Sequence, residues 1–224
     1  MNTQRRPLIV APRFTPLWGV LIGAVGGGVY WIGAQLWPTS IAVILSMLAT
    51  NLFAARMDPG VPPDSTASTP NSELLGVVFA VLVKYNALMA LSAASLPFAL
   101  PANLALGWIM IAGHAASRAL LVSVTASPDR PAPMLTPTPM PTPTPTPASH
   151  ADLGVALVLG FGPAALIGLP GLIGLAGAIA ARFAVLALLR RRGRATSADR
   201  ELKMTQQSTE VCFYLGALAA WAYI

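Results

Sequence analysis

Charged side chains are scarce in this chain of 224 residues. Lys, Arg, Asp and Glu together make up 10% of the sequence, whereas a soluble domain usually carries about 25%. Apolar residues make up 55%, and the mean hydropathy is +0.65. Because this composition suits a protein whose solvent is lipid, we expect an integral membrane protein rather than a soluble domain.

Cysteine is nearly absent as well, since Cys212 is the only one. An intrachain disulfide is therefore excluded, and so is a metal site built from several cysteines of one chain. The net charge of +6 does not indicate a nucleic-acid partner, because the basic residues are concentrated at the ends of apolar runs, as in membrane proteins. Residues 1–10 precede no short apolar run with a cleavage site, so we expect no cleaved signal peptide.

Long apolar runs are what the sequence has in abundance. A helix needs roughly 20 apolar residues to cross about 30 Å of hydrocarbon. Open sheets cannot satisfy their backbone in lipid, and the runs lack the alternation of barrel strands. We therefore predict an all-α polytopic transmembrane helix bundle of about seven helices, forming a single membrane domain over 1–224. The spans are expected near 17–37, 41–55, 74–96, 104–125, 153–169, 172–189 and 211–224.

Basic residues fall on alternate connections between these spans. They precede the first span and follow the second, the fourth and the sixth, with the largest cluster at 190–203. The other connections hold none, which predicts a cytoplasmic N-terminus. The cytoplasmic connection after the fourth span contains a Thr/Pro-rich linker, 131–147. Its alternating prolines favour an extended, solvated spacer, with a docking segment for a partner as the alternative.

Ionisable side chains inside the predicted spans are candidates for function, because burying them in a membrane is costly. Lys84 lies near the middle of the third span, where its long side chain either snorkels or is paired inside the protein, or else has a functional role. His114, Ser117 and Arg118 share one face of the fourth span at spacings of three and four. A planar, bidentate cation such as Arg118 suits phosphate when it faces a cavity. Glu210 belongs to a polar patch where the last span begins.

Two acids, Asp58 and Asp64, lie just past the second span. A membrane phosphotransferase could hold Mg²⁺ at such a position, since this ion prefers a few carboxylates together with substrate phosphate oxygens. The alternative interpretation is that both are solvated loop acids.

Four segments carry a pattern in a fixed order along the chain. They are 16–23 (PLWGVLIG), 84–88 (KYNAL), 113–118 (GHAASR) and 206–215 (QQSTEVCFYL). In order and spacing they resemble the P-L-x-G-x-x-x-G, K-Y-x-A-L, small-His-Ala-x-Ser-Arg and Q-Q-x-x-E-x-x-F-Y-L segments of the cobalamin synthase family. These are the membrane-bound adenosylcobinamide-GDP ribazoletransferases of late vitamin B12 assembly.

The acidic segments depart from the pattern of that family. The family carries D-G-x-x-D-x-x-D-G after the second helix, which is taken to hold Mg²⁺ against the GDP diphosphate. This chain keeps Asp58 but has Pro62 and Ser65 at the next two acid positions. The T-G-D segment before the last helix has Arg200 at its acid position, with Asp199 beside it. The sequence therefore predicts a retained scaffold with a weakened metal site.

The resemblance implies a reaction that joins adenosylcobinamide-GDP and α-ribazole to give adenosylcobalamin and GMP. It implies Arg118, Lys84 and Glu210 as catalytic residues, and Asp58 and Asp199 as ligands of a Mg²⁺ cofactor. The expected location is a bacterial inner membrane. The expected partners are the lipid bilayer, the two substrates and a membrane complex of the corrinoid pathway. The alternative is a catalytically inactive relative that acts as a membrane scaffold in that pathway.

Overall fold

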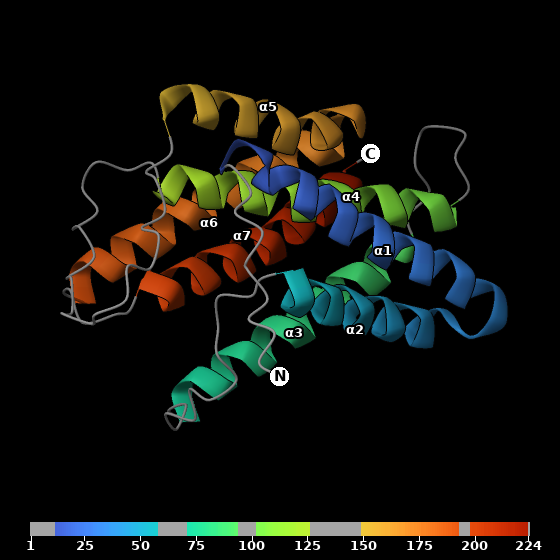
Figure 1. The fold of residues 1–224 in the computed structure, drawn as a ribbon. Helices are drawn as coiled ribbons and strands as arrows, with labels where there is room; N and C mark the ends of the chain where they lie inside the picture. Colours follow the sequence, from blue (N-terminus) through green and yellow to red (C-terminus); the bar gives the residue numbers. More distant parts are fainter. Residues whose placement is uncertain (1–11, 58–70, 94–101, 126–148, 193–197, 224) are drawn as a thin grey trace, which may run out of the picture.

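The computed structural model describes residues 12–57, 71–93, 102–125, 149–192 and 198–223. The regular structure of these residues is helical, which confirms the predicted all-α class. A short 3-10 helix, η1, precedes a series of α-helices (Figure 1). Their bounds are η1 (Pro12–Phe14), α1 (Thr15–Leu36), α2 (Thr39–Met57), α3 (Asn71–Ser92), α4 (Ala102–Thr125), α5 (His150–Leu166), α6 (Leu169–Arg192) and α7 (Ala198–Trp221). The Thr/Pro-rich linker 131–147 lies outside the described residues.

Local signals in the sequence explain several of the helix ends. α1 stops before Trp37, whose backbone is extended (φ −135°, ψ 162°), because a residue that precedes proline is disfavoured in the helical region. α5 starts with a capping box in which the Ser149 side chain accepts from the backbone of Asp152 and the Asp152 carboxylate accepts from the backbone of Ser149. The tight turn into α6 contains Gly168 at φ 79°, a left-handed conformation that favours glycine.

The long apolar helices make this a multi-pass membrane protein. Five segments are long and apolar enough to cross a bilayer: Pro12–Leu36, Thr39–Arg56, Leu75–Ser92, Leu104–Val124 and Leu169–Leu188. α5 is apolar but shorter, and α7 carries polar side chains through its first half. The exact bounds of the membrane spans stay a prediction, because length and composition alone define these segments.

The centre of the bundle is α4, which is surrounded by α1, α5, α6 and α7 (Figure 1). Its Leu106, Met110 and Ala116 side chains are fully buried. The outermost helix is α3, on which Leu75 and Phe79 are 68% and 69% exposed. Large apolar side chains that face outward are expected where lipid covers the protein, so the outer face of α3 is suited to the bilayer.

Glycines allow the closest helix contacts. A Cβ atom added at Gly27 on α1 would lie 2.8 Å from the Cα atom of Gly107 on α4, and one added at Gly23 would lie 2.4 Å from the Cα atom of Ile111. Both distances are too short for any side chain, so the two backbones touch directly. Small residues at such crossings are the usual means by which membrane helices pack.

The helices alternate in direction across the bundle. Figure 1 shows α1, α3, α5 and α7 running one way and α2, α4 and α6 running the other. This alternation gathers basic side chains at one end, where α1 and α7 begin and α2 and α6 end; they include Arg13, Arg56, Arg190, Arg191 and Lys203. We call this the basic end. The opposite end carries tryptophans near the end of α1, the start of α4 and the end of α7; they are Trp37, Trp108 and Trp221.

Candidate functional site

Four polar side chains from three helices meet inside the bundle. Lys84 comes from α3, His114 from α4, and Glu210 and Tyr214 from α7. As whole residues, the four are between 0% and 8% exposed. We call these four residues the buried ionic cluster. It unites three of the four sequence segments described above, which are far apart along the chain.

The contacts of the cluster converge on one carboxylate oxygen, Oε1 of Glu210. The Lys84 ammonium donates a hydrogen bond to it and forms an ion pair with it. The Tyr214 hydroxyl donates to the same atom over 3.2 Å, and Nε2 of His114 lies 3.3 Å away. A buried carboxylate needs such partners, because removing its hydration is costly unless charge and hydrogen bonds replace it.

Helix periodicity explains how α7 supplies two members of the cluster. Glu210 and Tyr214 are four residues apart, so they project from the same face of the helix. The Thr209 hydroxyl on this helix is occupied locally, because it donates to the Thr205 carbonyl over 2.8 Å. Tyr214 was missed by the sequence analysis, although its spacing of four from Glu210 was the signal that could have found it.

The α4 face that the sequence analysis singled out is buried as a whole. His114, Ser117 and Arg118 are 5%, 1% and 6% exposed. The Ser117 hydroxyl donates to the His114 carbonyl over 3.0 Å, so its hydrogen bond is made within α4. From this face, His114 contacts Glu210 through its Nε2 atom. Arg118 lies one turn further along α4 and does not line the cavity described next.

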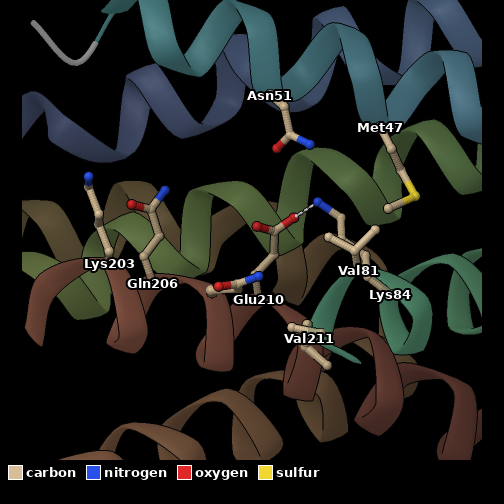
Figure 2. Close-up of a pocket in the computed structure, with 10 residues that line it drawn as sticks. Met47, Asn51, Val81, Lys84, Lys203, Gln206, Glu210 and Val211 are labelled. Atoms are coloured by element: carbon tan, nitrogen blue, oxygen red, sulfur yellow. Dashed lines mark hydrogen bonds and ion pairs between the residues drawn. The ribbon is translucent and has the colours of Figure 1, made fainter. Parts of the chain in front are cut away.

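A cavity of about 280 Å³ opens beside the buried ionic cluster, between α2, α3 and α7 (Figure 2). Its polar lining comes from α2 (Asn51), α3 (Lys84) and α7 (Lys203, Gln206, Gln207 and Glu210); its apolar lining is Met47, Ala80, Val81 and Val211. Asn51 and Lys203 are further residues that the sequence analysis did not place at a site. The lining includes the exposed Lys203, so the cluster is reachable from outside the bundle.

The two expected metal ligands, Asp58 and Asp199, lie outside the side chains that the structure describes, so their role stays a prediction. Asp58 lies outside the described residues, and Asp199 is described only as backbone in the first turn of α7. No group of three or more His, Cys, Asp or Glu side chains that could hold a metal occurs among the residues searched, which are the described ones. Glu210 is engaged with Lys84, so it does not fit a ligand of Mg²⁺.

The fold and the site together define a class of protein: a helical membrane protein with a charged cluster at the base of a polar cavity. Two known proteins are similar in sequence, one from Ralstonia nicotianae and one from Ralstonia pickettii, and both are named adenosylcobinamide-GDP ribazoletransferase. Each is 30% identical to this chain, over 138 and 132 residues respectively. The similarity supports a distant relationship to the cobalamin synthase family.

The two matches cover only part of each chain. They include 53% and 50% of this chain, and 51% and 48% of the two relatives. The chain therefore spans about half the length of the curated relatives it matches. No family model and no solved structure matches the chain.

Proposed function

We propose that this protein acts in cobalamin biosynthesis as an adenosylcobinamide-GDP ribazoletransferase. The names of its two relatives support this function. The observation that carries the proposal is the buried ionic cluster, in which Lys84, His114 and Glu210 come from three segments that resemble the family and meet beside one cavity. A cluster that served packing alone would not need a polar cavity next to it.

The proposed reaction forms one phosphorus–oxygen bond and breaks another. The hydroxyl oxygen of α-ribazole attacks the phosphorus atom joined to cobinamide, and GMP leaves with the electron pair of the broken bond. The hydroxyl proton is lost in the same process. Catalysis of such a transfer depends on positioning and on offsetting negative charge. In the proposal Lys84 supplies positive charge in the cavity lining, and Arg118 adds positive charge from behind it, one turn beyond His114 on α4. Glu210 fixes the position of Lys84 and contacts the hydroxyl-bearing substrate.

Magnesium is part of the proposal and rests on the resemblance. Asp58 follows the end of α2 at Met57, and Asp199 lies in the first turn of α7. Asp58 comes after Asn51 along the chain, and Asp199 comes before Lys203. The end of α2 and the start of α7 both lie at the basic end of the bundle. Bound there, the ion would offset charge on the diphosphate. The side chains that would hold it, Asp58 and Asp199, lie outside the described ones.

The proposed location is a bacterial inner membrane, with the basic end in the cytoplasm. Lys and Arg are enriched on cytoplasmic loops, and aromatic residues such as tryptophan mark membrane interfaces. The described basic side chains at helix termini gather at the end where α1 begins, so the N-terminal side of α1 is cytoplasmic in this proposal. In this proposed orientation the cavity, which Asn51 and Lys203 line, lies in the cytoplasmic half, where soluble substrates can reach it.

A second candidate function is an inactive relative that acts as a scaffold for a corrinoid-pathway membrane complex. The observation that favours it is the loss of two acids, replaced by Pro62 and Ser65, from the expected metal motif. An assay of GMP release separates the candidates. Purified protein in lipid nanodiscs, supplied with both substrates and Mg²⁺, should release GMP only when α-ribazole is present. A scaffold should release none.

A further inference from the structure

Asn86 is an exposed amide on α3, the outermost helix of the bundle (Figure 1). It lies within the apolar segment Leu75–Ser92, six residues and so about 9 Å along the helix axis from the nearer end. Two other exposed amides in the membrane-length segments have evident settings. Gln35 lies in the last turn of α1, and Asn51 lines the cavity. Asn86 has neither setting, because it faces outward where lipid surrounds the bundle.

The hydrogen bonds of Asn86 are only partly made within its own helix. Its Nδ2 atom donates to the Leu82 carbonyl over 2.8 Å. An amide has a second N–H group and an oxygen that accepts, and among the described residues no partner meets either of them. Lipid tails offer neither donors nor acceptors. A second protein surface is therefore the partner that suits this amide.

A stripe of exposed side chains runs along α3 through Asn86. Its members recur at spacings of three and four, so they project from one side of the helix. We call them the outer stripe: Leu75, Phe79, Leu82, Asn86 and Ala90. Lys84 is buried on the opposite side, since two positions are about 200° around the helix. One amide within an apolar stripe of this spacing is a pattern by which membrane helices associate side by side.

Symmetry favours a second copy of the same chain as the occupant of this stripe. Two copies of a membrane protein insert with the same orientation, so a two-fold axis that relates them runs along the membrane normal. Helices beside the axis are then parallel, and identical residues meet at the same depth. Because an amide both donates and accepts, Asn86 and the partner's Asn86 satisfy each other. Ala90 is small enough for the two helices to approach closely.

We propose that the protein forms a two-fold dimer in the membrane through the outer stripe of α3, with hydrogen bonds between the two Asn86 amides. The dimer holds α3 from outside, whereas the ion pair of Lys84 with Glu210 holds it from inside. Since α3 supplies one wall of the cavity, association also steadies that wall. The dimer is independent of the proposed reaction, because it forms without substrate.

Disulfide crosslinking in isolated membranes tests which side of α3 meets the second copy. In a Cys212→Ala background each variant carries a single thiol. Leu82→Cys should form a crosslinked dimer on oxidation, because its two thiols lie close together across the axis. The matched control is Val77→Cys, which is 44% exposed but lies about 180° around the helix from Asn86 and should stay monomeric. Equal crosslinking of the two variants would indicate random collision and overturn the proposal.

The role of the amide is tested by the affinity of the dimer. Single-molecule photobleaching in liposomes, over a range of protein-to-lipid ratios, measures the fraction of dimer. Asn86→Leu should weaken association about three- to tenfold, the size expected for a hydrogen bond between membrane helices. Gln35→Leu, which removes an exposed amide from α1, should associate as the unaltered protein does. Monomers at every ratio would overturn the proposal and leave lipid as the cover of the outer stripe. An unchanged dimer in Asn86→Leu would overturn it as well.

Discussion

Glu210 on α7 and Lys84 on α3 form an ion pair inside the bundle, although 126 positions separate them in the sequence. Each side chain is 10% exposed, so the pair is largely withdrawn from solvent. The Lys84 ammonium also lies 5.8 Å from the centre of the Tyr214 ring, at a distance where cation–π attraction contributes. The pair therefore ties the outermost helix to the centre of the protein.

Removing one charge of this pair should destabilise the fold. Glu210→Gln leaves the Lys84 ammonium without its counter-charge, and we expect a loss of about 3–5 kcal/mol in the free energy of unfolding, as for other broken buried pairs. Adding Lys84→Met should recover a large part of that loss. Unfolding by sodium dodecyl sulfate in mixed micelles measures all three variants. Losses that simply add in the double variant would contradict the pairing.

The close packing of α1 against α4 should depend on Gly27. Gly27→Ala would place a methyl group 2.8 Å from the Cα atom of Gly107, and we expect it to cost about 1–3 kcal/mol because neither backbone can yield freely. The control is Gly28→Ala on the same helix, where an added Cβ meets nothing within 4 Å. That variant should be neutral or stabilising by up to about 1 kcal/mol. Equal melting temperatures for the two variants would show that the contact does not matter.

The helical class and the buried face of α4 were predictable from the sequence. Apolar runs of membrane length specify helices by themselves, and the spacing of His114, Ser117 and Arg118 places them together on any regular helix. The partner of Lys84 was not predictable, because neither composition nor periodicity says which helices become neighbours. The helical structure of the first half of α7 was not predictable either. This half begins at Ala198 and is rich in polar residues, which carry no hydropathy signal.

The orientation of the bundle should be visible by chemical labelling. In a Cys212→Ala background, Thr39→Cys at the start of α2 and Arg191→Cys at the end of α6 place single thiols at opposite ends. A membrane-impermeant maleimide added to intact spheroplasts should label only the Thr39→Cys protein. Lysis should expose the Arg191→Cys protein as well. Labelling of Arg191→Cys before lysis would reverse the proposed orientation.

Metal dependence provides a separate prediction. If Asp58 holds Mg²⁺, chelation should abolish GMP release, and added Mg²⁺ should restore it. Asp58→Ala should lower turnover at least about tenfold, since losing even the supporting residues of metal sites has effects of this size. Asp152→Ala is the matched control, because this aspartate caps α5 through Ser149 and does not line the cavity. Turnover that does not change on chelation would contradict a role for Mg²⁺ in the reaction.

The most direct measurement of the proposed function is complementation of a bacterium that lacks its own cobalamin synthase, supplied with cobinamide and dimethylbenzimidazole. We predict B12-dependent growth with the unaltered chain and no growth with Asp58→Ala, with both proteins detected in the membrane by blotting. Failure of the unaltered, membrane-inserted protein to support growth would contradict the transferase assignment and favour the scaffold.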